Sequence, residues 1–245
     1  MNPFINPMTC LPFLKNYIIE PNRLIKNDKK RIKKYRDKAF KRIVKYAYTV
    51  PIYHKKYKNA GVHPDDINGI DDAHKLPFIT KKDLMKSYPI GITSTNYKKR
   101  SELLASTSGS TGKPIFFYVD FSALSKAVLL QLRLFHSFNI DWKKTKYVSV
   151  GNLSEATADR VFKEGFLDKL PDFLSKNLVS NINAFGNIKH LINELNSHRP
   201  DIIMSYPATF QQLAYFKKKN YLDNLNPKLI IASGSCLDDY AREYI

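Results

Sequence analysis

The chain has 245 residues, of which 43% are hydrophobic and 25% are charged, and this balance excludes an intrinsically disordered protein. Its length suits one large domain or two smaller ones. The 40 Lys and Arg residues outnumber the 22 Asp and Glu residues and give a formal net charge of +18. Such a charge favours anionic partners, which include nucleotides, nucleic acids and lipid surfaces.

The N-terminal stretch and the cysteines indicate the compartment. No apolar run reaches the roughly 18–20 residues that a transmembrane helix needs, and prolines at positions 3, 7 and 12 make residues 1–20 a poor secretory signal. Cys10 and Cys236 are the only cysteines, so neither a disulfide framework nor a cysteine metal site is predicted. We therefore expect a reduced, cytoplasmic protein without a membrane span.

The first predicted element is a strongly basic helix over residues 26–45. Apolar residues recur along it at helical spacing, and basic residues fill its other faces: Ile32, Tyr35, Ala39, Ile43 and Tyr46 or Ala47. This pattern predicts a surface helix whose apolar stripe packs on the core. The alternative is a helix that binds nucleic acid or an anionic membrane surface.

Short helical pieces follow, separated by prolines and glycines over residues 50–89. Thr80, with Asp83 three positions later, predicts a helix N-terminus with a variant of the capping box. Residues 1–100 are therefore predicted to be a helical segment that packs on the core.

From residue 101 the pattern changes to strands that alternate with helices, which predicts an α/β fold with a mainly parallel sheet flanked by helices. Residues 101–245 would form this part. The helix over 121–138 is apolar over most of its surface, and we expect it to be buried. The predicted strands are 102–107, 115–119, 146–150, 177–181, 201–206 and 227–235, and the predicted helices are 121–138, 187–198, 207–219 and 237–245.

Ligands of such folds bind beyond the carboxyl ends of the strands. We expect the turns at 107–114, 151–154 and 233–236 to lie there and to contain the site.

The stretch 106–114, STSGSTGKP, has the composition of a phosphate-binding loop. Its glycines allow main-chain N–H groups to surround an anion, and its hydroxyls and lysine add donors. It is not a Walker A loop, because Thr107 stands where the first glycine is required and Pro114 where a Ser or Thr binds magnesium. A strand on either side predicts a glycine-rich hairpin over phosphates, and the alternative is a hairpin turn without a ligand.

Residues 107–114, TSGSTGKP, resemble the phosphate loop of the adenylate-forming (acyl-CoA synthetase) superfamily. Three further stretches are similar to its phenylacetate–CoA ligase-like branch, which includes proteins of capsule biosynthesis: 50–89, 183–216 and 229–237. The resemblance covers about residues 40–245 and implies that the chain is the N-terminal part of an ATP-dependent ligase. Such enzymes join a small carboxylic acid to the α-phosphate of ATP and pass the acyl group to CoA or another acceptor.

The resemblance also implies residue roles. The β- and γ-phosphates of ATP would be held by Thr107, Ser108, Gly109, Ser110, Thr111, Gly112 and Lys113. The adenine would lie beside Ser233, Gly234 and Ser235, although Ser235 stands where many relatives have an acidic residue. Candidates for the acyl pocket are Gly151, Asn152, Tyr206 and Pro207, and plain strand-end packing is the alternative for the last two.

The family's Mg²⁺-binding glutamate, its ribose-binding Asp and its catalytic lysine lie beyond the adenine turn, so no residue here is assigned to metal binding or catalysis. We expect either a piece of a longer enzyme or a truncated product. Histidines such as His54, His136 and His190 offer no base–nucleophile pair. The alternative function is a non-catalytic basic module that binds nucleic acid or an anionic surface, of which nucleic acid is the less favoured partner. The sequence leaves a homodimer open.

Overall fold

The computed structural model describes residues 2–23, 28–97, 102–107, 112–172, 178–222 and 224–245. Contacts divide the chain into two compact units, of which the first is Met1–Ile18 with Asp120–Ile245 and the second is Ile19–Val119. The division predicted at residue 100 stays a prediction. Among the described residues, no helix is long and apolar enough to span a membrane.

The second unit is built from short helices around a small core. Val44, Tyr57 and Ile67 are buried at its centre. As predicted, the Thr80 hydroxyl accepts a hydrogen bond from the Asp83 N–H group at the start of α4, which completes a capping box. The helices are α2 (Lys29–Tyr48), α3 (Pro51–Asn59) and α4 (Lys81–Ser87), with 3₁₀ turns η1 (Pro64–Asp66), η2 (Ile70–Lys75) and η3 (Ile90–Ile92).

Helix α2 confirms the predicted basic helix but not its predicted buried stripe. Ile43 and Tyr46 are 64% and 60% exposed, whereas Val44 is 1% exposed. The stripe that packs on the core consists of Phe40, Val44, Ala47 and Tyr48, of which Ala47 was among the predicted positions. Both stripes have helical spacing, so the position of the partner helices decided between them.

The two strands predicted around the glycine-rich loop form an antiparallel hairpin in this unit. Strands β1 (Leu103–Ser106) and β2 (Phe116–Val119) pair so that Leu103 faces Val119 and Ser106 faces Phe116. This hairpin is a separate two-stranded sheet. Its strands are therefore not part of the parallel sheet, and the expectation that the turn at 107–114 lies beyond the carboxyl ends of the parallel strands stays a prediction.

The first unit contains a four-stranded sheet whose order is β4-β3-β5-β6 and whose paired strands all run parallel. Strands and helices alternate along the chain, as predicted. The strands are β3 (Tyr147–Gly151), β4 (Leu178–Asn183), β5 (Ile202–Ser205) and β6 (Leu229–Ala232). The helices are α1 (Pro7–Arg23, which belongs to this unit as far as Ile18), α5 (Phe121–Ser137), α6 (Ala158–Gly165), α8 (Ile188–His198), α9 (Pro207–Lys218) and α10 (Asp239–Tyr244), with a 3₁₀ turn η4 (Leu167–Lys169).

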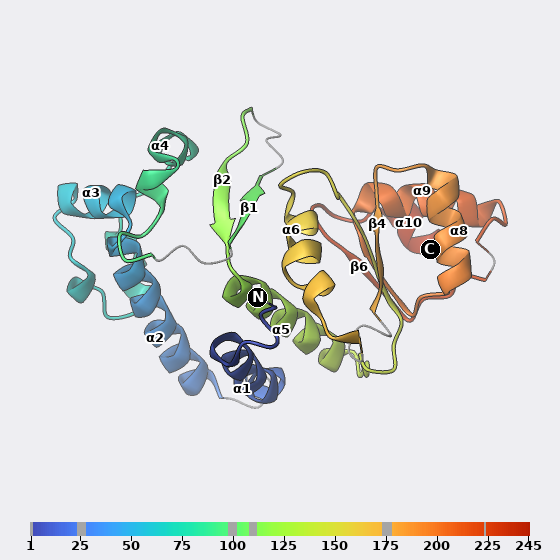
Figure 1. The fold of residues 1–245 in the computed structure, drawn as a ribbon, viewed down its shortest axis with the longest axis horizontal. Helices are drawn as coiled ribbons and strands as arrows, with labels where there is room; N and C mark the ends of the chain where they lie inside the picture. The colour runs from blue at the N-terminus through green and yellow to red at the C-terminus, as the bar shows by residue number, and fades with distance from the viewer. Residues whose placement is uncertain (1, 24–27, 98–101, 108–111, 173–177, 223) are drawn as a thin grey trace. The chain divides into compact units, whose positions relative to one another are not determined.

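Side chains that alternate along the strands supply a core on each face of this sheet. Val148 and Ile203 pack with residues of α8, α9 and α10, whereas Tyr147 and Ile202 pack with α5. Figure 1 shows α5 and α6 on one side of the strands and α8 to α10 on the other. The result is a three-layer α/β arrangement.

Helix α5 is buried along one stripe, so the expectation that this helix is buried holds for that stripe and not for its other face. Leu129, Leu132 and Phe135 face the sheet, whereas Leu130 is 59% exposed. Helices α1 and α6 were not predicted. Phe13 and Tyr17 of α1 pack on the α5 side of the core, and Phe166, which ends α6, stacks on Phe121 with ring centroids 5.7 Å apart.

Candidate functional site

The carboxyl ends of β3 and β5 form the point at which the winding of the sheet reverses. From β3 the chain crosses through α6 to β4 on one side, and it then returns through α8 to β5 and β6 on the other side of β3. Helices therefore leave the two adjacent strand ends toward opposite faces. Such a switch point leaves a crevice in which α/β proteins bind ligands. Two of the three predicted turns, 151–154 and 233–236, lie at this edge.

Asp159, in the first turn of α6, links these strand ends. Its Oδ2 atom accepts a hydrogen bond from the main-chain N–H group of Asn152 at 2.7 Å. The hydroxyl group of Tyr206 donates to the same oxygen. A Cβ atom on Gly151 would lie 2.6 Å from this oxygen, so the carboxylate needs a glycine at the end of β3.

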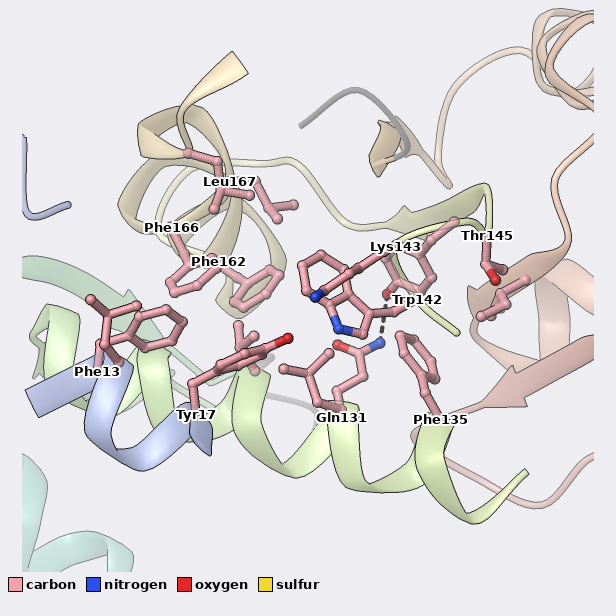
Figure 2. Close-up of a pocket in the computed structure, with 16 residues that line it drawn as sticks. Phe13, Tyr17, Gln131, Phe135, Trp142, Lys143, Thr145, Phe162, Phe166 and Leu167 are labelled. Carbon is pink, nitrogen blue, oxygen red and sulfur yellow. Dashed lines mark hydrogen bonds between the residues drawn. The ribbon is translucent and has the colours of Figure 1, made fainter. Parts of the chain in front are cut away.

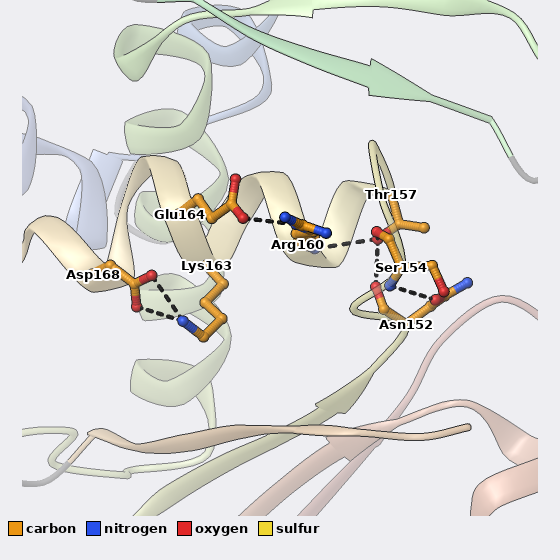
Figure 3. A network of polar contacts seen from close by, with 7 residues as sticks. All are labelled: Asn152, Ser154, Thr157, Arg160, Lys163, Glu164 and Asp168. Carbon is orange, nitrogen blue, oxygen red and sulfur yellow. Dashed lines mark hydrogen bonds and ion pairs between the residues drawn. The ribbon is translucent and has the colours of Figure 1, made fainter. Parts of the chain in front are cut away.

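The turn that leads from β3 into α6 is held by its own side chains, and Figure 3 shows Asn152, Ser154 and Thr157 gathered at the start of the helix. Asn152 Oδ1 accepts from the Ser154 N–H group at 3.0 Å. The Thr157 hydroxyl contacts the carbonyl oxygen of Ser154 at 2.9 Å and caps α6 by accepting from the Arg160 N–H group. These bonds give Asn152 a defined position.

The charged side chains along α6 pair with one another. Arg160 Nε lies 2.7 Å from Glu164 Oε1, and Lys163 Nζ lies 2.8 Å from Asp168 Oδ2 (Figure 3). Exposed pairs of this kind contribute little to stability. Asp159 differs from these exposed pairs, because its Oδ2 atom accepts hydrogen bonds from residues that follow β3 and β5.

Tyr206 has a raised pKa at this edge of the sheet. Burial, together with the nearby Asp159 carboxylate, raises the pKa of Tyr206 to about 12. The phenol is therefore protonated at neutral pH and can donate to Asp159. Its ring also lies close to the next turn, because a Cβ atom on Gly234 would be 3.6 Å from Tyr206 Cδ1.

The turn after β6 joins the same edge through the main chain. The Ser233 N–H group donates to the carbonyl oxygen of Ser205 at 3.0 Å, and the Ser205 hydroxyl donates to that of Val150 at 2.8 Å. Gly234 has a φ angle of +98°, which favours glycine, and Gly234 and Ser235 are exposed. Hydrogen bonds thus join the carboxyl ends of β3, β5 and β6.

Of the predicted acyl-pocket residues, Gly151, Asn152 and Tyr206 therefore meet at one place. Pro207 is buried as the first residue of α9, which agrees with strand-end packing as the role of this residue. The predicted adenine-side residues Ser233 and Gly234 adjoin them. Their roles toward a ligand stay predictions.

The predicted phosphate loop belongs to the hairpin of the second unit. The Thr107 N–H group donates to the Ile115 carbonyl oxygen at 3.0 Å, and the Thr107 hydroxyl accepts from the Ile115 N–H group at 3.1 Å, which closes the neck of the loop. Gly112 has a φ angle of +129°, and Lys113 is exposed. Ser108, Gly109, Ser110 and Thr111 lie outside the described residues.

The first unit also contains an apolar cavity of about 220 Å³ on the α5 side of the sheet. Figure 2 shows aromatic side chains around it, among them Tyr17, Trp142 and Phe162. Gln131 Nε2 donates to Tyr147 Oη at 2.9 Å in its wall. Tyr147 and Ile202 begin their strands, so this cavity lies at the amino edge of the sheet, away from the switch point.

Asp159 was not among the predicted site residues, although the sequence around it contains a signal. Thr157 followed by Asp159 is a typical helix start, with a capping hydroxyl and an acid in the first turn. Among the described residues, no group of three or more His, Cys, Asp or Glu side chains is arranged to hold a metal ion.

Comparisons with known proteins give matches over parts of the chain, although no protein-family model matches it. Over 72 residues, or 29% of the chain, it is 42% identical to phenylacetate-coenzyme A ligase of Pseudomonas putida, and this covers 16% of that enzyme. Over 179 residues, or 72% of the chain, it is 28% identical to Protein CapK of Staphylococcus aureus, of which it covers 38%. The chain thus matches well under half the length of these relatives.

Solved structures of 2-hydroxyisobutyryl-CoA ligase have a similar fold. The open conformation with 2-HIB-AMP and CoA gives a TM-score of 0.66 at 18% identity over 87% of this chain and 48% of that chain. The complex in the thioesterification state gives 0.65 at 21% identity over 86% and 47%. At these identities the likeness concerns the fold, and it confirms the predicted α/β class with a helical N-terminal segment.

Proposed function

Because the chain belongs to the phenylacetate–CoA ligase-like branch of the adenylate-forming superfamily, we propose that it forms the ATP- and carboxylate-binding part of an adenylate-forming ligase. The carboxylate oxygen of a small acid attacks the α-phosphorus of ATP, and the bond to pyrophosphate breaks. The acyl-adenylate then reacts with CoA or another acceptor, and AMP leaves.

The observation that carries this proposal is the string TSGSTGKP in the segment that joins the two strands of a β-hairpin, together with the matches to phenylacetate-coenzyme A ligases. Residues 107–113 would hold the pyrophosphate part of ATP. The closed neck at Thr107 and Ile115 and the positive φ angle of Gly112 suit a loop whose main-chain N–H groups surround an anion. Donors placed there would stabilise the negative charge that grows on the leaving pyrophosphate.

The carboxyl edge of the sheet would bind the acyl and adenine groups of the adenylate. Asn152 and Tyr206 would border the acyl group, and Ser233, Gly234 and Ser235 would border the adenine. A magnesium ion would accompany ATP, and the proposal assigns no residue of this chain to it. The identity of the acid and of the acceptor stays open.

Two measurements test the proposal. The full-length gene product should exchange labelled pyrophosphate into ATP when a suitable carboxylic acid is present, and no exchange with a broad panel of acids would refute the enzymatic function. In the chain itself, Lys113→Ala should weaken ATP binding about ten- to hundredfold, because it removes charged hydrogen bonds. Lys82→Ala, an exposed lysine of the same unit, is the matched control.

A second candidate function, binding to an anionic surface, is favoured by α2. Ile43 and Tyr46 are exposed on a helix rich in lysine and arginine, a pattern typical of interfacial helices. Binding to vesicles with anionic lipids should then weaken steeply with salt, and Ile43→Glu should reduce it. Equal binding to neutral and anionic vesicles would refute this function.

A further inference from the structure

Asp159 is held at the carboxyl ends of β3 and β5 by two hydrogen bonds and by the space that a glycine leaves. Two donors from different elements meet at one carboxylate oxygen, namely the Asn152 N–H group after β3 and the Tyr206 hydroxyl after β5. The absence of a side chain at Gly151 creates the room for that oxygen. The arrangement requires a short side chain with an accepting oxygen in the first turn of α6, since that oxygen must reach both donors.

The main chain at Tyr206 is held independently of Asp159. Ser205 is hydrogen bonded to β3 and β6, and Pro207, which is buried, begins α9. What remains free at position 206 is the rotation of the side chain. The hydrogen bond to Asp159 restrains that rotation at the far end of the ring.

The restrained ring lies against the glycine turn after β6, where Cδ1 comes within 3.6 Å of the position that a Cβ atom on Gly234 would take. Because the Tyr206 hydroxyl donates its proton to the carboxylate, it has no donor left for a ligand, and the ring is the part of this residue that can pack against one. A ring face suits a flat or apolar group.

We propose that Asp159 is a positioning residue, which fixes the Tyr206 ring against the Gly234 turn so that Tyr206 offers a ring face, and no hydroxyl donor, to the adenylate bound at this edge. This inference rests on the proposed function for the identity of the ligand. It goes beyond that function by assigning a role to Asp159 and by excluding the Tyr206 hydroxyl as a hydrogen-bond donor to the ligand.

A double-mutant cycle on AMP affinity tests the inference. Asp159→Ala and Tyr206→Phe should each weaken AMP binding about three- to tenfold, and the double variant should be no weaker than the weaker single variant, because both changes remove the same hydrogen bond. Asp159→Asn, which keeps an accepting oxygen, should restore most of the affinity. Matched controls are Asp168→Ala and Tyr215→Phe, which change exposed residues near or on the same helices.

A second readout separates positioning from a general loss of structure. In protein labelled with 3-fluorotyrosine, the ¹⁹F resonance of residue 206, assigned by its loss in Tyr206→Phe, reports its ionisation. Asp159→Ala should lower that ionisation midpoint, because the carboxylate helps to keep the phenol protonated. Far-UV circular dichroism and the fluorescence of Trp142, the single tryptophan, verify that each variant is folded.

The possible results distinguish a failure of this inference from a failure of the proposed function. Additive losses, with Tyr206→Phe the more severe, would show that the hydroxyl contacts the ligand and would overturn the inference. Unchanged AMP binding in a folded Asp159→Ala variant would overturn it too, while the proposed function stands. A wild-type chain that binds neither AMP nor ATP would instead overturn the proposed function, and with it the ligand-facing role of Tyr206.

Discussion

Thr80 and Asp83 hold each other's main-chain N–H groups at the start of α4. The Asp83 carboxylate accepts from the Thr80 N–H group at 2.8 Å, and the Thr80 hydroxyl accepts from the Asp83 N–H group at 3.2 Å. Thr80→Ala removes one half of this capping box. We expect the free energy of opening of α4 to fall by about 1 kcal/mol. Hydrogen exchange of peptides that cover residues 81–88 measures this value. Lys82→Ala, at an exposed position of the same helix, should leave it unchanged.

The same carboxylate makes the second unit sensitive to acid. The Lys56 ammonium group, 2.8 Å away, and the two donors of Thr80 hold the pKa of Asp83 far below its usual value of 3.8. Since the pKa is lowered on folding, the stabilisation is complete above about pH 4 and is lost as the pH falls below that value. Protection of α4 should therefore decrease from pH 5 to pH 2 in the wild type and change less in Asp83→Asn. Equal pH profiles would contradict the pairing.

Gly151→Ala tests the close approach of Asp159 to β3. The added Cβ atom would lie 2.6 Å from Oδ2 and 2.7 Å from Cγ of Asp159, so the carboxylate must move. We expect the first unit to lose about 1–3 kcal/mol of stability, the usual cost of overpacking. Urea unfolding followed by Trp142 fluorescence reports on this unit, which contains the single tryptophan. The double variant Gly151→Ala/Asp159→Ala should lose less than the sum of the single changes, and simple additivity would argue against the contact.

Adjacent residues of α2 test which stripe of the helix is buried. Val44→Ala removes a side chain that is 1% exposed and should cost the second unit about 2 kcal/mol. Ile43→Ala, at a position that is 64% exposed, should change its stability by less than about 0.5 kcal/mol. Hydrogen exchange of peptides from α2 and α3 distinguishes them. A larger effect at Ile43 would favour the stripe that the sequence predicted.

Phe210 of α9 is fully buried against the parallel sheet, and its replacement tests how much this core contributes to the stability of the first unit. Phe210→Ala should lower the stability of the first unit by about 3–5 kcal/mol, because it leaves a cavity. The matched control is Phe138→Ala, at a residue that is 58% exposed and ends α5. Urea unfolding followed by Trp142 fluorescence measures both. Similar small losses in the two variants would show that Phe210 does not carry the core.

Local patterns predicted most elements of the parallel sheet. Strand β5 came from a compact apolar run between Asp201 and Pro207, and α9 from a proline at its first position. Helices α1 and α6 escaped prediction. Prolines interrupt α1 at positions 12 and 21, and α6 has only eight residues, so packing against Phe121 of α5 rather than local preference stabilises them.

The sequence by itself determined the class of fold, the hairpin around the glycine-rich loop and the resemblance to adenylate-forming enzymes. These rest on the order of short segments and on residues adjacent in the chain. The tertiary structure decided which stripe of α2 is buried, because two stripes with the same spacing differ only in what packs against them. It also decided that Asp159 meets Tyr206, 47 positions away. A hydrogen bond over such a separation depends on the winding of β3, α6 and β5, which no local pattern encodes.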